Sequence, residues 1–336
     1  MSIKEVARLA GVSPSTVSRV INSGNTSAAS PETQERIWEA ARQIGYIPNQ
    51  NARKLRRPDS SVPMIAQRID CIFARFVGTN VDYFFEQLMH EVRTQLLING
   101  YQLGSICTLE DLPSLPPHSH ASAALILGRI NNSQMQLLQA QYKHLVSISL
   151  QDMDLPVDQV ISRGYDAART AVNHLYALGH RHICYLGEVD AEQRYEGYLD
   201  AMNAIGMTNP NPLVVDATFS PASGYDAAVE LLRRQVPFTA ILCANDMLAL
   251  GVIKALNEHK LRVPRDVSIV GINDKEDVRY LSPMLTAVNI PIEEMGAHAA
   301  KLLLDRIAGN HQLPVKMILP NKLIVRESCG PARTIV

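Results

Sequence analysis

The chain has 336 residues, of which 46% are hydrophobic and 19% are charged, so it is long enough for two or three domains of a soluble globular protein. Its five cysteines are scattered and form no Cys-x-x-Cys pair, which argues against a disulfide framework and a zinc site. No signal peptide and no long apolar span is visible, so we expect a cytoplasmic protein.

Charge is distributed unevenly along the chain, although the net charge is only −1. Residues 1–57 carry nine Lys and Arg against four Glu, whereas the remainder carries 23 basic and 29 acidic residues. A small basic head on an acidic body fits phosphate binding by the head alone. A solvated charged surface is the alternative, and it would be preferred if the head lacked a binding motif.

The first 22 residues predict a helix-turn-helix. Ser2 and Glu5 fit a capping box at the start of the first helix, and Gly11 permits a tight turn after it. Ser13 can cap a second helix that has Pro14 at its first position. The two helices are expected to pack through Val6, Leu9, Ala10, Val17, Val20 and Ile21. Such a unit lays its second helix in the major groove of DNA.

A third helix is predicted from Pro31, with Ser30 as its cap and Gly45 as its stop. Its apolar positions are Ile37, Ala40, Ala41 and Ile44. Asn49 can then cap a short basic helix from about residue 50 to 56. That helix is too short to persist alone in water, where ~12–15 residues are normally needed. Residues 57–63 follow as a linker.

From about residue 65, strands and helices alternate. Apolar runs predict strands at residues 69–73, 123–127, 145–150, 183–186, 240–243 and 267–272. Helices are predicted at residues 84–98, 167–178, 222–233, 248–258 and 293–307. Gly100, Gly179 and Gly206 fit helix ends. The alternation predicts parallel sheets flanked by helices, and its length predicts two lobes with a ligand cleft between them.

These segments resemble the lactose-repressor (LacI/GalR) family of transcriptional regulators. In the head and hinge, the resemblance lies in residues 3–7, 10–13, 16–22, 45–49 and 52–55. In the core, it lies in residues 178–180, 194–198, 244–246, 249–251 and 270–274. The resemblance covers nearly the whole chain. The head and hinge motif is highly specific, and the core motifs are less so because bacterial sugar-binding proteins share that fold.

The resemblance implies an α/β protein with an N-terminal three-helix head, containing the helix-turn-helix, and a periplasmic-binding-protein-like core of two doubly wound parallel-sheet lobes. The implied domains are a DNA-binding head at 1–48, a hinge helix and linker at 49–64, and an effector-binding and dimerisation domain at 65–330. Its N-lobe takes about 65–160 plus 292–318, and its C-lobe about 161–290 plus 319–330.

The family resemblance further implies a homodimeric repressor that reads two-fold symmetric operators. Arg19 is the strongest base-reading candidate, because its planar fork can contact guanine O6 and N7 together. A phosphate contact or a surface ion pair is the alternative for Arg19. Pro14 and Ser15 match the other base-reading positions. Phosphate contacts, which fix register, are expected from Ser13, Thr16, Ser18 and Asn22.

In this family the hinge folds to a helix on operator DNA. Leu55 matches a leucine that wedges into the minor groove, Ala52 matches the small residue beside it, and Asn49 and Arg53 belong to the same DNA-binding segment. Wedging unstacks a base step and bends the DNA toward further contacts. A basic linker with an exposed Leu55 is the alternative.

Effector ligands are implied at strand ends that face the cleft. Arg194 matches an arginine that bonds sugar hydroxyls, and Asn245 matches a ligand residue. Phe219 matches an aromatic that stacks on the sugar, with ordinary core packing as its alternative. Asn273 stands where many members have a ligand aspartate, and Ile292 replaces an aromatic found in some members.

Two further features concern the same cleft. Asp246 is expected to cap a helix rather than to bind ligand. Residues 75–84 lack the usual Asn-Pro-Phe after the first core strand, and there Arg75 and Asp82 either line the cleft or face solvent.

The sequence therefore predicts a repressor of sugar-utilisation genes, controlled allosterically by a mono- or disaccharide between the lobes. A non-sugar effector such as a purine, a cytosolic sugar-processing enzyme and a transport-type binding protein are the alternatives. We expect no enzymatic activity, cofactor or metal, because no P-loop, G-x-S-x-G or H-E-x-x-H motif occurs and because His180 and His182 fit surface or turn roles. No apolar heptads follow residue 325, so we expect a homodimer rather than a tetramer.

Overall fold

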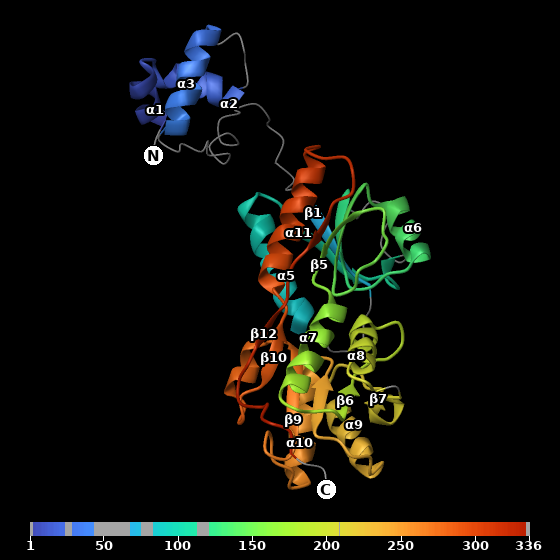
Figure 1. Cartoon of the computed structure of the whole chain (residues 1–336). Coiled ribbons are helices and arrows are strands. Elements are labelled where there is room, and N and C mark those ends of the chain that lie inside the picture. The colour runs from blue at the N-terminus through green and yellow to red at the C-terminus, as the bar shows by residue number, and fades with distance from the viewer. Residues whose placement is uncertain are drawn as a thin grey trace. The chain divides into compact units, whose positions relative to one another are not determined.

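The computed structural model describes residues 3–23, 29–43, 68–74, 83–112, 121–207 and 209–333. They belong to two compact units, residues 1–65 and residues 66–336, which we call the head and the body (Figure 1).

The head contains α1 (Ile3–Ala10), α2 (Pro14–Ser23) and α3 (Pro31–Gln43). The predicted helix-turn-helix is confirmed: Gly11 has a φ of 66°, and the Val12 N–H donates to the Ala7 carbonyl at 3.0 Å to close α1. Ser13 Oγ accepts from the Thr16 N–H at 3.1 Å, so it caps α2 as expected.

The helices described in the head, α1, α2 and α3, share one apolar core. It consists of Val6, Ala7, Ala10, Val17, Val20, Ile37, Ala40 and Ala41. The prediction that Leu9 packs in this core is wrong, because Leu9 is 41% exposed and Ala7 takes the buried position instead. Ala7 lies four residues before Gly11, on the side of α1 that faces α2 and α3.

The first sheet of the body is entirely parallel, with the order β11-β5-β4-β3-β1-β2. Its strands are β1 (Arg68–Phe73), β2 (Gln102–Thr108), β3 (Ala123–Leu127), β4 (His144–Ser149), β5 (Asp158–Ile161) and β11 (Lys316–Ile318). Side chains alternate between its faces: Cys71 and Leu125 join one core cluster, whereas Ile72 and Ile126 join another. We call this sheet and its helices the N-lobe.

Among the described residues, helices cover both faces of the N-lobe sheet. On one face, α5 (Tyr83–Ile98) and α11 (Ile292–Ile307) pack side by side (Figure 1). On the other face, α6 (Asn132–Gln141) contributes Met135 and Leu138 to the cluster that contains Ile72. The central strands β1, β3, β4 and β5 are buried on both faces, which is typical of parallel sheets.

The second sheet has the order β12-β10-β9-β8-β6-β7 and is parallel except for β12, which runs antiparallel to β10. Its strands are β6 (Ile183–Leu186), β7 (Val214–Val215), β8 (Ala240–Cys243), β9 (Ser268–Asn273), β10 (Thr286–Asn289) and β12 (Lys322–Ile324). Its helices are α7 (Gly164–Ala177), α8 (Gln193–Ala204), α9 (Pro221–Arg233) and α10 (Asp246–Glu258). We call this sheet and its helices the C-lobe.

Within residues 121–333 the chain passes between the lobes three times, at residues 161–164, 289–292 and 318–322. The predicted pair of doubly wound parallel sheets is therefore confirmed. Gly100, Gly179 and Gly206 have φ values of 79°, 94° and 90°, as the predicted helix ends require.

His180 departs from its predicted surface or turn role. It is 2% exposed, and its ring nitrogens lie 2.8 Å from Thr239 Oγ1 and 3.0 Å from the Gly330 carbonyl. It follows α7 directly, so it ties the end of that helix to the C-terminal tail. Burial lowers the pKa of His180, which favours the neutral ring in this position.

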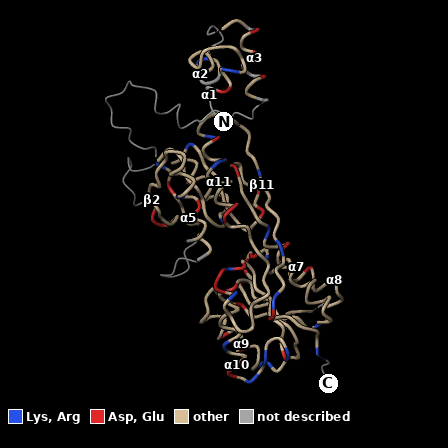
Figure 2. Tube along the Cα trace, turned by 90° about the vertical axis from the view of Figure 1, so that its left-hand side faces the viewer, with Lys and Arg blue, Asp and Glu red and all other residues tan. Residues whose placement is uncertain are grey.

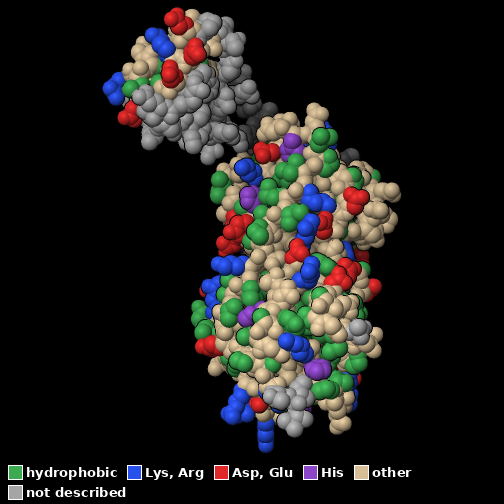
Figure 3. Space-filling view, viewed as in Figure 1, with side chains coloured by type: hydrophobic (Ala, Val, Ile, Leu, Met, Phe, Trp, Pro, Cys, Tyr) green, Lys and Arg blue, Asp and Glu red, His purple; other side chains and the backbone are tan. Residues whose placement is uncertain are grey.

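Charged residues of both signs are interspersed along the body, as the trace in Figure 2 shows. On the face drawn in Figure 3, apolar side chains are scattered between them instead of forming one large patch. Among the described residues, no helix combines the length and the apolar character needed to cross a bilayer.

Candidate effector site and DNA-reading helix

The five predicted effector residues follow five neighbouring strands of the C-lobe sheet. Ile292, Asn273, Asn245, Arg194 and Phe219 come at or after the ends of β10, β9, β8, β6 and β7, in the order in which these strands lie in the sheet. Because these strands are parallel, their carboxyl ends lie along one edge. Ligands of open α/β sheets bind at that edge, next to the point where strand order reverses, which here lies between β6 and β8.

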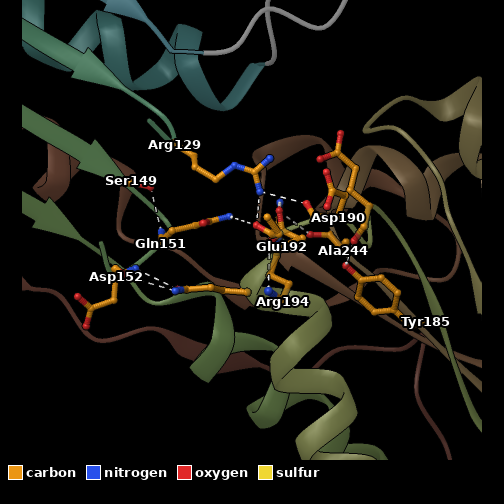
Figure 4. A network of polar contacts seen from close by, with 12 residues as sticks. Arg129, Ser149, Gln151, Asp152, Tyr185, Asp190, Glu192, Arg194 and Ala244 are labelled. Carbon is orange, nitrogen blue, oxygen red and sulfur yellow. Dashed lines mark hydrogen bonds and ion pairs between the residues drawn. The ribbon is translucent and has the colours of Figure 1, made fainter. Parts of the chain in front are cut away.

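Arg194 links several groups at this edge. Its Nε and Nη2 donate to Glu192 Oε1 and Oε2 at 2.8 and 2.9 Å, which is a bidentate ion pair (Figure 4). Nη1 donates to the Ala244 carbonyl at 2.9 Å and so bridges the segments after β6 and β8. The guanidinium carbon lies 4.4 Å from the Phe219 ring centroid. The structure thus brings Arg194, Phe219 and the residue before Asn245 together.

Glu192 was not among the sequence candidates, yet it fixes Arg194. It is the N-cap of α8, and Oε1 accepts from the Arg194 backbone N–H at 3.0 Å as well as from Arg194 Nε. Burial alone would raise the pKa of Glu192, but the charge and hydrogen bonds of Arg194 and the charge of Arg129 lower it. Glu192 is therefore an anion inside the protein.

Asn245, and not Asp246, is the cap of α10. Asn245 caps α10, because its Oδ1 accepts from the Leu248 N–H at 2.9 Å. Asp246 is the first helical residue, and its Oδ2 accepts from the Lys275 N–H at 2.8 Å. The prediction that Asp246 caps the helix is wrong, since the cap position falls one residue earlier. Burial raises the pKa of Asp246 to about 7.

Asn273 ends β9 in an unusual backbone conformation. Its φ is 118° and that of Asp274 is 60°, a region that non-glycine residues rarely occupy and that clusters at functional sites. Asn273 is 4% exposed, and its Oδ1 has no hydrogen-bond partner among the described residues. A buried acceptor left open at this edge can receive a ligand donor.

Ile292 differs from the other candidates. It is 5% exposed, begins α11 and packs in the main hydrophobic core. It lies on the segment that crosses to the N-lobe. Arg75 and Asp82 lie outside the described residues.

The N-lobe meets the C-lobe at the same edge. Arg129, which follows β3, donates from Nη1 to the carbonyls of Asp190, at 3.1 Å, and Ala191. Gln151, which follows β4, donates to the Ala191 carbonyl at 3.1 Å. These partners lie in residues 187–192, which we call the β6–α8 loop (Figure 4).

A reciprocal pair of hydrogen bonds adds to this contact. The Asp152 N–H donates to Gln193 Oε1 at 2.9 Å, and Gln193 Nε2 donates to the Asp152 carbonyl at 3.2 Å. The Asp152 carboxylate also pairs with Arg163 on a crossing segment, at 2.7 Å, and with Lys316 at the start of β11, at 2.8 Å. The salt bridges and hydrogen bonds from Lys316 and Arg163 lower the pKa of Asp152.

In the head, the exposed side of α2 carries the predicted base-reading residues. Pro14, Ser15 and Arg19 are exposed, whereas Val17 and Val20 on the opposite side are buried. Arg19 Nε lies 3.4 Å from the Ser15 carbonyl, so the two residues occupy one face.

The other predicted DNA contacts fall in two groups. Ser13 is exposed and its Oγ lies 2.8 Å from Thr16 Oγ1, at the N-terminus of α2 where phosphates bind readily. Outside the described residues lie the side chains of Ser18 and Asn22 and the whole of Asn49, Ala52, Arg53 and Leu55.

Two family models match the chain. Residues 2–49 match the lacI family of bacterial regulatory proteins, and residues 172–329 match a periplasmic binding protein-like domain. The first match covers the described head, and the second covers most of the C-lobe with the crossing into α11.

Several relatives match nearly the full chain. The transcriptional repressor PurR of Haemophilus influenzae (strain PittEE) is 32% identical, and the transcriptional regulator CelR of Thermobifida fusca is 31% identical; each match covers 97% of this chain and 98% of the relative. A solved structure of a transcriptional regulator CelR–cellobiose complex is 29% identical, with a TM-score of 0.70 over 98% of this chain and 99% of that one. With its helix-turn-helix head and two-lobed body, the chain belongs to the LacI family of bacterial transcriptional regulators.

Proposed function

We propose that the protein is a repressor of sugar-utilisation genes whose hold on operator DNA is controlled by a small sugar at the carboxyl edge of the C-lobe sheet. The observation that carries the proposal is the cluster of Arg194, Glu192 and Phe219. In this cluster the Arg194 guanidinium, whose charge is balanced by the Glu192 carboxylate, lies against the Phe219 ring. The hydroxyl groups of a sugar can hydrogen-bond to the guanidinium, and its C–H face can stack on the aromatic ring. Buried groups that bond hydroxyls discriminate sharply between sugars.

The charge of the edge favours an uncharged effector. Arg194 is paired with Glu192, Arg129 donates to carbonyls, and Asp190 and Glu188 add negative charge to the same loop. A phosphate or carboxylate on the effector would face these acids. The CelR relative is solved with cellobiose, which is an uncharged disaccharide and supports the same class here.

A purine effector is the second candidate. Phe219 is half-exposed, and a ring of this kind stacks on a planar base as well as on a sugar. The open Oδ1 of Asn273 is also able to accept a ring N–H. A sugar-processing enzyme is the least supported alternative, because the named relatives are transcriptional regulators.

The DNA-binding part of the proposal follows the family. We assign base reading to Pro14, Ser15 and Arg19 on the exposed side of α2, and phosphate contacts to Ser13, Thr16, Ser18 and Asn22. Asn49, Ala52, Arg53 and Leu55 would form the minor-groove hinge. The corresponding domains are 1–48, 49–64 and 65–330. We infer a cytoplasmic homodimer that meets a two-fold symmetric operator with two heads.

Arg19→Ala tests the base-reading assignment. We expect it to lower affinity for a palindrome from the protein's own upstream region by about 10- to 100-fold, and to relax the preference over a random duplex. Fluorescence anisotropy at about 150 mM salt measures both. Arg8→Ala is the matched control, because Arg8 is exposed on α1 and carries the same charge. Equal losses of preference in both variants would show that Arg19 contacts only phosphate.

A thermal-shift screen tests the effector class. A ligand that binds the folded state raises the melting temperature, by an amount that grows with its concentration over Kd. We expect cellobiose or another mono- or disaccharide to stabilise the protein and to change its affinity for the palindrome. If only purines stabilise the protein, its effector is a purine and not a sugar. If the protein hydrolyses an added sugar, the assignment as a regulator is wrong.

A further inference from the structure

We propose that Glu192 is a positioning residue for Arg194, and that the β6–α8 loop transmits contact between the lobes to this arginine. The proposal rests on the proposed function, in which Arg194 binds the effector. Glu192 lies between two sets of contacts: the N-lobe holds the residues on either side of it, and its own side chain holds Arg194.

The carboxylate of Glu192 determines where the guanidinium points. Oε1 and Oε2 accept from Nε and Nη2 of Arg194, which fixes the plane of the fork as well as its position. The side chains of Arg194 and Glu192 are 8% and 6% exposed, so water competes little for these bonds. Without the carboxylate, Arg194 would lose the two bonds that fix the plane of its fork, although Nη1 would still donate to the Ala244 carbonyl.

The backbone around Glu192 is held from the N-lobe. Arg129 donates to the carbonyls of Asp190 and Ala191, and Gln151 also donates to that of Ala191. Asp152 donates one hydrogen bond to Gln193 and accepts another from it. Ala191 has a φ of 47°, so the loop turns sharply just before Glu192. The N-lobe partners in these bonds, Arg129, Gln151 and Asp152, follow β3 and β4, so the bonds break together if the lobes separate.

Electrostatics links the same groups. The charge of Arg129 on the N-lobe helps to lower the pKa of Glu192 on the C-lobe, so it stabilises the ionised carboxylate that Arg194 needs. Separation of the lobes removes that charge and these contacts at once. By linkage, a ligand that binds the oriented Arg194 must then favour contact between the lobes.

The competing explanation is that Glu192 is only a helix cap. Asp is a better N-cap than Glu, so Glu192→Asp preserves or improves a capping role. Its side chain is shorter by one methylene and no longer spans Nε and Nη2 of Arg194. The two explanations therefore predict opposite results for this variant.

The first experiment needs no ligand. In the full chain with ¹⁵N-labelled arginine, hydrogen exchange of Arg194 Nε–H is measured by NMR, with the signal assigned by its loss in Arg194→Lys. We expect Glu192→Asp and Arg129→Met each to speed this exchange at least five-fold. Arg181→Met is the control for the second variant, because Arg181 donates to the carbonyls of Tyr176 and His180 within its own lobe. Exchange unchanged within two-fold in Arg129→Met would overturn the proposal.

The second experiment measures affinity for cellobiose by calorimetry. We expect Glu192→Asp to bind at least ten-fold more weakly than the unchanged chain, and Arg129→Met about three- to ten-fold more weakly. Because both act through one loop, the double variant should match Glu192→Asp within two-fold. Unchanged affinity in Glu192→Asp would contradict the proposal. So would a loss of affinity in the double variant that equals the product of the losses in the two single variants. Failure of the unchanged chain to bind cellobiose counts against the proposed sugar instead, and the exchange result still decides the role of Glu192.

Discussion

Two aspartates of the body are both completely buried, yet pH acts on them in opposite directions. Asp246 accepts a backbone hydrogen bond from Lys275, and the charge of Asp274 lies nearby. Asp158 in β5 accepts from Arg306, from His311 at 2.9 Å and from the Val315 N–H at 2.7 Å. The hydrogen bonding of Asp246 does not offset its burial. Asp158 has three hydrogen-bonding partners, one of which is the Arg306 cation, and these partners offset its burial.

For Asp246, burial raises the pKa from 3.8 to about 7. A folded-state value above the unfolded one means that the folded protein binds the extra proton between about pH 4 and 7. The stability from this group is therefore fully present at low pH and is lost as pH rises through 7. A pKa that differs by one between the folded and unfolded states corresponds to about 1.4 kcal/mol of stability.

Asp246→Asn should remove that dependence. We expect the free energy of unfolding, measured with urea at pH 5 and pH 8, to fall less between the two values in the variant than in the unchanged chain. Asp226→Asn is the control, because Asp226 is exposed on α9 and loses the same charge. If Asp246→Asn leaves the pH dependence unchanged, Asp246 is ionised throughout this range.

For Asp158, burial tends to raise the pKa, but the hydrogen bonds from Arg306, His311 and Val315 lower it overall. The stability from this group is present above the unfolded value, near 4, and is lost as pH falls through the folded one. Asp158 joins β5 to α11 and to the segment before β11, so its charge holds three parts of the N-lobe.

Asp158→Asn is expected to cost about 3 kcal/mol at pH 7, since it leaves Arg306 without the carboxylate that compensates it. Urea unfolding measures the loss. Asp266→Asn breaks an exposed pair with Arg262 and should change stability far less. Equal effects of the two substitutions would mean that the pair in the N-lobe contributes no more than a surface contact.

At the scale of elements, α9 and α10 pack unusually closely. A Cβ on Gly251 would lie 1.9 Å from the Pro221 carbonyl oxygen, and one on Gly224 would lie 2.2 Å from that of Leu248. Both neighbours are backbone, which cannot swing aside as a side chain does. The absence of a side chain at these two positions therefore sets the distance between the helices.

Gly251→Ala should force α9 and α10 apart. We expect a loss of about 1–3 kcal/mol, the usual cost of overpacking, measured as a lower midpoint in urea. Gly330→Ala provides the comparison, because a Cβ there would meet Pro264 at an ordinary 3.5 Å. A Gly251→Ala protein as stable as the unchanged chain would show that the helix pair is easily displaced.

Several buried strands were predictable from the sequence. The strands at Ala123–Leu127, Ile183–Leu186 and Ala240–Cys243 agree with their apolar runs residue for residue, because every position in them is buried. Six strands were missed: the edge strands β2, β7, β11 and β12, and also β5 and β10. The strands β2, β11 and β12 are partly exposed and contain residues such as Lys316 and Lys322, so their sequences show no apolar run. The strands β5 and β10 are largely buried, but each has only four residues and includes polar ones, so they were not recognised either.

The site was predictable only in part. Strand ends and the family resemblance placed Arg194 and Asn245 at one edge, which the structure shows. Glu192 and Arg129 were missed for different reasons. Helix α8 has few large apolar residues and was not predicted, so Glu192 had no recognisable cap position. Arg129 donates to backbone carbonyls, and because every residue has a carbonyl, no sequence pattern reveals such partners.

At the scale of the whole molecule, the separation of charge between head and body predicts how DNA binding responds to salt. The first 57 positions are net basic, and the remainder is net acidic. Phosphate contacts release counterions, so affinity falls steeply as salt is added.

We expect affinity for the palindrome to fall at least 100-fold between about 50 and 200 mM KCl, as is usual when several phosphates are neutralised. Anisotropy titrations at four salt concentrations give the slope. Asp226→Asn alters the charge of the body and should leave the slope unchanged. A flat response would exclude phosphate binding as the main source of affinity.

The three crossings also bear on synthesis at the ribosome. Each sheet receives an edge strand, β11 or β12, only from residues 316–324, although its other strands are translated earlier. A nascent chain that stops before residue 316 would contain most of the sequence but leave β5 and β10 each with an unpaired side. Open strand edges invite aggregation, so a late nonsense codon should be as damaging to solubility as an early one.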